Sequence, residues 1–398
     1  MSEILKDIRG DRGLWGALLL LSAVSFLPIY SASSNIVNVI GSSSTTIFLG
    51  KHVLILILGF IILFYVHKIP YRYFSGSSVF LLPFVFALLI YTLSKGTTIA
   101  GATAARWIEI PYLQVSFQPS TFASVILMIY VARYFSRRKD VTFEFKDSFW
   151  FLWVPVGLIL MPILPSNFST TALIFLSVVI ISLLVGYPFK FLLRIIGLAL
   201  IALTLFIFVG RSFSTAIKNK TETWKNRIIK SNPDDLDAVY QVEKAKMAIA
   251  TGGVVGRGSG KSVQKNFLPQ SSSDFIFAII VEEYGLVGGI GIILIYMWLL
   301  FRIWVISKRA QTIFASLLTI GVGFPIIIQA ILNMAVATDS FFVTGQTLPL
   351  LSSGGTSIWM TFIAMGIILS VSSAQEEIDK NEPVKDENPL DVLYEAVD

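Results

Sequence analysis

Residues 50–67 read GKHVLILILGFIILFYVH, an apolar run in which Lys51 is the only formally charged residue. A helix rises about 1.5 Å per residue, so about 20 mostly apolar residues cross the roughly 30 Å hydrocarbon core of a bilayer. The run therefore predicts a membrane-spanning helix. Nine further runs fit the same template: 14–31, 76–95, 119–135, 148–164, 169–187, 190–210, 274–304, 311–334 and 355–373. Together they predict an all-α polytopic membrane protein with about ten transmembrane helices.

The composition of the whole chain agrees with this prediction. Of its 398 residues, 55% are hydrophobic and 14% are charged, whereas an average soluble protein has about 25% charged residues. A soluble enzyme and a disordered chain are thereby excluded. The chain has no cysteine, which excludes disulfides, iron–sulfur clusters and cysteine zinc sites. His52 and His67 are the only histidines, and about 22 Å of helix separates them, too far to share a metal ion.

Lysine and arginine mark alternate connections between the spans, as is typical of cytoplasmic loops. They stand at Lys6, Arg9 and Arg12, at Lys68 and Arg72, at Arg133, Arg137, Arg138 and Lys139, at Lys190 and Arg194, and at Arg302, Lys308 and Arg309. The connections at 32–49, 165–168 and 335–354 contain neither residue type. We therefore predict a multi-pass protein of the cytoplasmic (inner) membrane with both termini in the cytoplasm.

The spans divide the chain into five segments. These are a cytoplasmic N-terminus (1–13), helices 1–7 (14–210), a large extracytoplasmic loop (211–273), helices 8–10 (274–373) and a cytoplasmic tail (374–398). From Gln375 onward the tail carries a net charge of −7, which leaves +13 on the rest of the chain. The acidic tail is predicted to be disordered. The basic remainder favours contact with anionic head groups or an anionic substrate. Inside the loop, 221–229 and 235–251 predict short amphipathic helices.

The loop contains a glycine-rich stretch, GGVVGRGSGKS at 252–262. A nucleotide-binding P-loop requires glycine at the position that Val255 occupies, and it follows a strand, so a nucleotide site is excluded. We predict a flexible backbone whose N–H groups approach an anion together with Arg257, Lys261 and Lys265. An ordinary exposed basic loop is the alternative.

Three acidic residues stand at or near the start of the span that follows this loop. Asp274 comes after three serines, an arrangement that suits a helix start, but a carboxylate at the outer interface can also accept a proton from a substrate hydroxyl. Glu282 and Glu283 lie two turns further along the same predicted helix, about 12–13 Å deeper. Carboxylates at that depth are functional candidates, with hydrogen bonding inside the bundle as the alternative.

Two other external features have both a functional and a structural interpretation. Arg106, which precedes Trp107, either anchors an interfacial segment or binds phosphate through its planar guanidinium. The stretch 348–357, LPLLSSGGTS, is a broken, re-entrant segment before the last helix. Irregular backbone near membrane depth is tolerated where it is buried or lines a cavity, so we predict that it forms one wall of a site.

Motifs in these regions occur together in one known family. They lie at Arg106–Ile108, Phe117–Ser120, Tyr240–Gln241, Ala248–Gly253, Gly256–Lys265, Phe267–Ala278, Glu282–Gly285 and Leu348–Gly355. In this order they resemble the SEDS family of peptidoglycan glycosyltransferases, which comprises FtsW, RodA and SpoVE. The segment FQPSTFA at 117–123 and the long tail are more similar to the FtsW branch, which acts in cell division.

The resemblance implies a ten-helix enzyme that polymerises lipid II, with Asp274 as the essential carboxylate. We expect Asp274 to be the general base for the acceptor hydroxyl, with undecaprenyl pyrophosphate as the leaving group. It also implies a class B penicillin-binding protein as partner, along with other divisome proteins and membrane lipid. The residues predicted to bind substrate are Arg106, Arg257, Lys261, Gln264, Lys265, Pro269, Ser352, Gly354 and Gly355, with Glu282 and Glu283 in supporting roles.

The chain also departs from the family pattern. Gln270 replaces a common glutamate, Ser124 replaces a usual lysine, and 166–170 read SNFST where many relatives have an aspartate-containing loop. No cofactor is predicted with certainty, and a divalent cation, Mg²⁺ or Mn²⁺, is left open. A lipid II flippase or polyisoprenyl-phosphate transporter without catalytic chemistry is the alternative function. A structural division scaffold is a third, and nucleic acid is not a predicted partner.

Overall fold

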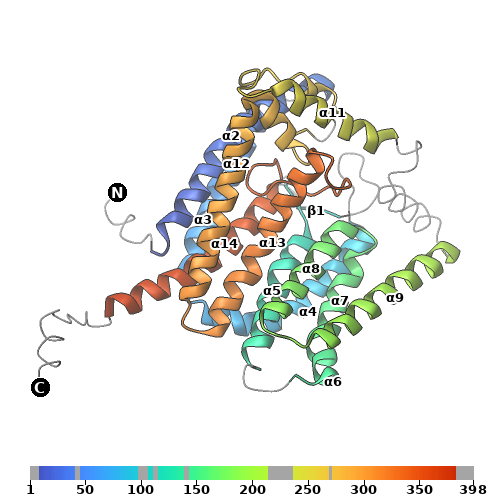
Figure 1. The fold of residues 1–398 in the computed structure, drawn as a ribbon, viewed down its shortest axis with the longest axis vertical. Helices are drawn as coiled ribbons and strands as arrows, with labels where there is room; N and C mark the ends of the chain where they lie inside the picture. The colour runs from blue at the N-terminus through green and yellow to red at the C-terminus, as the bar shows by residue number, and fades with distance from the viewer. Residues whose placement is uncertain are drawn as a thin grey trace, which may run out of the picture.

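The computed structural model is a bundle of long helices (Figure 1). It describes residues 9–40, 45–96, 106–110, 115–138, 143–213, 236–268 and 271–381. Within these residues, eight helices are long and apolar enough to cross a membrane. The prediction of an all-α polytopic membrane protein is therefore confirmed.

Helices occupy each of the ten predicted spans. Nine of the spans correspond to α2 (Arg12–Ile40), α3 (Thr45–Lys68), α4 (Arg72–Lys95), α5 (Pro119–Ser136), α8 (Phe168–Leu184), α9 (Phe189–Phe213), α12 (Ile276–Arg309), α13 (Ile313–Ala337) and α14 (Gly355–Asn381). The span at 148–164 is built from α6 (Phe145–Ser148), the π-helical turn η1 (Phe149–Trp153) and α7 (Val154–Ile163). Neither α5 nor the 17-residue α8 is among the eight candidate spans. The number of ten crossings therefore stays a prediction.

Shorter elements lie in the two long connections. Between α4 and α5, β1 (Ile108–Ile110) pairs antiparallel with β2 (Val115–Phe117). Between α9 and α12, the structure contains α11 (Leu236–Gly252) and the 3₁₀ turn η2 (Gln264–Asn266). The helix predicted at 235–251 is thus confirmed as α11. The one predicted at 221–229 lies outside the described residues.

The core of the bundle surrounds α13 and α14. In their most apolar windows, 61% of the α13 residues and 72% of the α14 residues are buried, against 11% for α9. Figure 1 shows α13 between α12 and α14 on one side and α5 and α8 on the other, and it contacts all four. The close approach of α3 to α14 requires a glycine, because a Cβ atom on Gly59 would lie 2.3 Å from the ring of Phe362.

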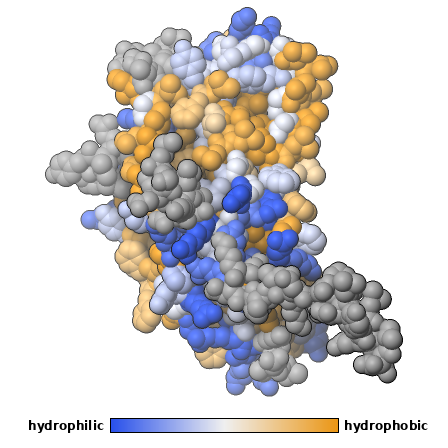
Figure 2. All heavy atoms as spheres, turned by 90° about the vertical axis from the view of Figure 1, so that its left-hand side faces the viewer, coloured by the Kyte–Doolittle hydropathy of each residue, from blue (hydrophilic) through white to orange (hydrophobic). Residues whose placement is uncertain are grey.

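The outside of the bundle carries large apolar side chains, as a lipid-facing surface requires. Phe80, Phe208 and Met161 are all largely exposed. Figure 2 shows one face on which apolar side chains dominate the upper half and hydrophilic side chains the lower half. Such segregation is expected where one zone meets hydrocarbon and the other meets water.

The span predicted at 274–304 is not one continuous helix. Gly285 has φ 66° and ψ −168°, which breaks α12 after Tyr284. The 24 residues from Leu286 to Arg309 extend about 36 Å, enough to cross a bilayer without the first part. Glu282 and Glu283 both precede the break and belong to the first part of α12. Their depth in the membrane stays a prediction.

The last helix extends further than predicted. α14 continues to Asn381 instead of ending at 373, so residues 374–381 are helical and not disordered. Contacts with the start of the chain explain this extension. Glu377 pairs with Arg9, and the Glu376 carboxylate accepts a hydrogen bond from the Gly10 N–H at 3.1 Å. The two ends of the described chain therefore meet at one end of the bundle.

Candidate functional site

Asp274 lies just before the first part of α12, where the long connection between α9 and α12 ends. The N-cap position of that helix is Phe275, so Asp274 is not its capping residue. The Asp274 side chain is half-buried. Its Oδ2 atom lies beside Gly345, where an added Cβ would be 3.5 Å away. The Asp274 carbonyl oxygen accepts a hydrogen bond from Asn333 Nδ2 at 2.8 Å.

The irregular segment before α14 packs against the residues that precede Asp274. Ser352 Oγ donates to the Ser273 carbonyl at 2.6 Å, and it accepts from the Leu348 N–H at 2.7 Å. The N–H and Oγ of Ser353 both donate to the Ser272 carbonyl, each at 2.9 Å. Gly354 follows directly, and Gly355 opens α14. The segment is non-helical and largely buried, and these hydrogen bonds pair part of its backbone. That it forms one wall of a site stays a prediction.

The glycine-rich stretch pairs with the broken part of α12 through backbone hydrogen bonds. The N–H groups of Arg257 and Gly258 donate to the carbonyls of Glu282 and Glu283 at 3.0 and 2.9 Å. Gly256 has φ +87° and Gly285 has φ +66°, and a Cβ atom on either would lie 2.2 Å from a carbonyl oxygen opposite. Only glycine fits both positions. This part of the stretch is therefore held against α12, a contact that the prediction of a flexible backbone did not include.

The anion that the glycine-rich loop surrounds is the carboxylate of Glu282. It accepts hydrogen bonds from Ser262 Oγ, from the Val263 N–H at 2.9 Å and from the Gln264 N–H at 3.2 Å. Arg257 Nη1 lies 3.4 Å from its Oε1 atom. The Glu282 side chain is fully buried, so these donors replace its water.

Glu283 faces a different set of partners. Its Oε1 atom accepts hydrogen bonds from Ser31 Oγ of α2 and from the Ser262 N–H at 3.3 Å. Lys265 Nζ donates to Ser31 Oγ at 3.1 Å and to the Gly260 carbonyl at 2.9 Å. Ser31, Lys265 and Glu283 are all buried. The loop is thus tied to α2 as well as to α12.

Replacement by glutamine should destabilise the protein to different extents at Glu282 and at Glu283. Both oxygens of Glu282 accept hydrogen bonds, whereas Glu283 Oε2 has no partner among the described residues. Glu283→Gln should therefore destabilise the protein less than Glu282→Gln, by about 1–2 kcal/mol, because only the latter places an amide N–H₂ against a buried donor. Unfolding midpoints in detergent measure the difference, and equal losses would contradict this assignment of partners.

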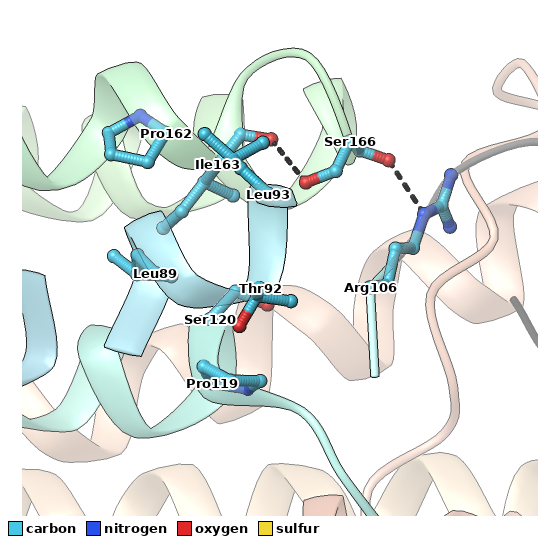
Figure 3. A pocket seen from close by; sticks show the side chains of 9 residues that line it. All are labelled: Leu89, Thr92, Leu93, Arg106, Pro119, Ser120, Pro162, Ile163 and Ser166. Carbon is cyan, nitrogen blue, oxygen red and sulfur yellow. Dashed lines mark hydrogen bonds between the residues drawn. The ribbon is translucent and has the colours of Figure 1, made fainter. Parts of the chain in front are cut away.

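Arg106 belongs to a third cluster, where the last turns of α4 and α7 meet the first turn of α5. Arg106 Nε donates to the Ser166 carbonyl at 2.6 Å. Figure 3 shows Arg106 and Ser166 at one side of a pocket whose opposite wall is apolar. The other lining residues are Leu89, Thr92, Leu93, Pro119, Ser120, Pro162 and Ile163. The pocket therefore combines a guanidinium with a largely apolar lining.

Several hydrogen bonds, connected through the covalent chain of the residues that make them, lead from this pocket to Asp274. Asn167, which follows Ser166, accepts from the Thr170 N–H at 3.2 Å. Thr170 Oγ1 accepts from Gln346 Nε2 at 3.0 Å. The Gln346 carbonyl and the Asp274 carbonyl are both bonded to the side-chain amide of Asn333, at 2.7 and 2.8 Å. The structure therefore joins Arg106 and Asp274 through one polar network.

The predicted site residues separate into two groups. Asp274, Ser352 and Gly354 lie together, with Arg106 connected through the network. Arg257, Gln264 and Lys265 instead surround Glu282 and Glu283, and Lys261 belongs to the same loop. Pro269 lies outside the described residues. Sequence reasoning missed Ser31, Ser262, Asn333 and Gln346. A usable signal was the presence of two amide side chains, Gln329 and Asn333, on the largely apolar α13.

A metal site needs several His, Asp or Glu side chains that converge on one point. Among the residues that the structure describes, no group of three or more His, Asp or Glu side chains is arranged to hold a metal ion. Glu282 and Glu283 are adjacent, but protein donors already surround Glu282. The described residues thus form no cage of protein ligands for a divalent cation.

Comparisons with known proteins place these features in a family. The model of the FtsW, RodA and SpoVE family, described as "Cell cycle protein", matches residues 11–377. Among curated relatives, "Probable peptidoglycan glycosyltransferase FtsW" of Enterococcus hirae is 29% identical, covering 96% of both chains. The protein of that name from Nitrosomonas europaea is 30% identical, covering 90% of this chain and 91% of the relative.

Two solved structures share the fold. One comes from a study entitled "Structural coordination of polymerization and crosslinking by a peptidoglycan synthase complex", and it matches with a TM-score of 0.71 at 22% identity, covering 92% of this chain and 98% of the other. The rod shape determining protein RodA of Thermus thermophilus matches with a TM-score of 0.64 at 22% identity, covering 92% and 97%.

Proposed function

Because the chain belongs to the FtsW/RodA/SpoVE family of cell cycle proteins, we propose that it is a peptidoglycan glycosyltransferase acting in cell division. Its substrate is lipid II, which it polymerises into glycan strands at the outer face of the cytoplasmic membrane. The observation that carries the proposal is a half-buried carboxylate, Asp274, held beside a buried, irregular segment at the end of the bundle that contains the external loop. The names of the curated relatives support the activity.

The proposed reaction transfers one glycan to another. Asp274 accepts the proton of the acceptor GlcNAc 4-hydroxyl while that oxygen attacks the anomeric carbon of the donor. A new C–O bond forms to the acceptor, and the bond between the anomeric carbon and undecaprenyl pyrophosphate breaks. The bonding pair leaves with the pyrophosphate, and the proton remains on Asp274 until solvent removes it.

The departing pyrophosphate needs cationic stabilisation, and Arg106 is the best placed of the predicted residues. Its side chain lines the pocket beside Ser166, and a guanidinium binds phosphate in a bidentate manner. Lys265 is less suited, because it is buried and bonded to Ser31 and Gly260.

Replacing Arg106 with alanine should weaken both the binding of lipid II and its turnover. Charge-assisted hydrogen bonds contribute about 1.5–3 kcal/mol, so we expect kcat/KM to fall about 10- to 100-fold. Arg106→Lys should recover only part of the loss, because lysine is a point charge without the planar fork. Initial rates over a range of lipid II concentrations measure this effect. A kcat/KM equal to that of the wild type would contradict the assignment.

The proposal also includes a membrane location and partner proteins for the enzyme. The alternation of basic loops supports a cytoplasmic-membrane location with both termini inside, and the contact of Arg9 with Glu377 supports placing both ends on one side. The matching structure from a peptidoglycan synthase complex supports a class B penicillin-binding protein as partner, with other divisome proteins beyond it.

The decisive experiment reconstitutes the protein in liposomes with its penicillin-binding partner, whose transpeptidase is inactivated, and supplies lipid II. A ladder of glycan chain lengths is the expected result. Absence of polymer with the partner verified as bound, together with movement of labelled lipid II between leaflets, would instead establish the transport function.

A further inference from the structure

The apolar helix α13 carries two buried or half-buried amide side chains one turn apart. Gln329 and Asn333 are four residues apart and so lie on one face of the helix. Only 1% of Asn333 is exposed. A buried amide without partners is costly, so the partners of these two side chains indicate what they do.

Both amides donate hydrogen bonds to residues outside α13, in the segment 345–347 that borders Asp274. Gln329 Nε2 donates to the Thr347 carbonyl at 2.8 Å and lies 3.2 Å from Thr347 Oγ1. Asn333 Nδ2 donates to the carbonyls of Gln346 and Asp274 at 2.7 and 2.8 Å. Both protons of the Asn333 amide are thus used, one on each of the two segments that meet at the site.

We propose that Asn333, assisted by Gln329, is a positioning residue that fixes the Asp274 carboxylate relative to the 345–347 segment. The inference rests on the proposed function of Asp274. Asn333 touches the Asp274 backbone, so it acts through Asp274 and not on substrate. Gln329 holds the adjacent Thr347, and Gly345 of the same segment borders Asp274 Oδ2.

A side chain that only stabilises α13 is expected to form its hydrogen bonds within that helix. Thr319, also fully buried on α13, donates to the Ala315 carbonyl of its own helix at 2.9 Å. Such a bond concerns α13 alone. The amide of Asn333 instead joins segments from three parts of the chain, at 274, 333 and 346.

The size of the expected effect follows from geometry. A general base must lie within hydrogen-bond reach of its proton, and a displacement of about 1 Å can cost about 100-fold in rate. Asn333→Ala should therefore lower kcat about 100-fold with KM for lipid II changed less than about threefold, because the pocket around Arg106 keeps its own contacts. Gln329→Ala should lower kcat about tenfold, because Asn333 remains.

The test uses the full-length protein with its transpeptidase-inactivated partner, in liposomes containing lipid II. The variants are Asn333→Ala, Gln329→Ala and Thr319→Val, measured for kcat, KM and unfolding midpoint. Thr319→Val is the matched control, because it also removes one buried hydrogen bond from α13, about 21 Å of helix away. We expect it to keep the wild-type kcat, whatever its unfolding midpoint.

The outcomes separate this inference from the proposed function. A loss of kcat in Asn333→Ala and Gln329→Ala that exceeds the loss in Thr319→Val supports it. Wild-type kcat in both amide variants overturns it while leaving Asp274 as the base, and so does a loss that appears in KM alone. If Asn333→Ala does not fold, Gln329→Ala decides by the same criterion. Polymer formation by Asp274→Asn would overturn the proposed base and this inference with it.

Discussion

Replacing Asp274 with asparagine should almost abolish glycan polymerisation while the protein still folds. General-base catalysis contributes about 10²–10⁴-fold to rate, and an amide oxygen cannot accept the hydroxyl proton at neutral pH. The substitution keeps the size of the side chain. It also leaves the backbone carbonyl that Asn333 binds at 2.8 Å. The ladder of glycan chain lengths, compared at equal amounts of folded protein, measures the loss.

Asp339→Asn is the matched control for this experiment. Asp339 lies in the segment between α13 and α14, the segment that contains Gly345 beside Asp274. It pairs with Lys246 at 3.2 Å, and its side chain is 32% exposed. Its φ of 58° is a conformation that asparagine also tolerates. Activity close to that of the wild type is expected for Asp339→Asn. Substantial polymer from Asp274→Asn at normal protein levels would remove Asp274 from its proposed role.

The largest effect on stability should come from Glu282→Ala. Its carboxylate accepts hydrogen bonds from Ser262 Oγ and from the Val263 and Gln264 N–H groups. Without the carboxylate these donors lose their partner, at about 1–3 kcal/mol for each one that stays buried. The ion pair between Arg257 and Glu282 contributes little to stability, because the Arg257 side chain is partly exposed to solvent. We expect a loss of about 3–5 kcal/mol, seen as a lower unfolding midpoint in detergent.

Glu243→Ala provides the control for that substitution. Glu243 lies on the exposed face of α11, so its removal should change the free energy of unfolding by less than about 0.5 kcal/mol. Limited proteolysis of the external loop offers a second measurement, because Glu282→Ala should expose the segment around 257–265 to cleavage. An unfolding midpoint as high as that of Glu243→Ala would show that Glu282 does not hold the loop.

The sequence alone determined where the helices lie and which residues deserved attention. The run at 50–67 became α3, Thr45–Lys68, and the other nine runs also coincide with helices. Hydropathy is a local property, and a bilayer imposes the same length on every crossing, so this prediction needs no knowledge of packing. Asp274 and the 348–354 segment were found by their residue types in order along the chain, and they lie beside each other in the structure.

The tertiary structure alone decided which polar groups meet. Ser31 reaches Glu283, Gln346 reaches Thr170, and Asn333 reaches Asp274. Each of these pairs joins helices or loops that are remote in sequence, so no local pattern specifies it. The break at Gly285 is of the same kind, because its positive φ is stabilised by pairing with the backbone at 253–258. Hydropathy fixes how long a helix is, but only the packed bundle fixes which buried donors and acceptors find each other.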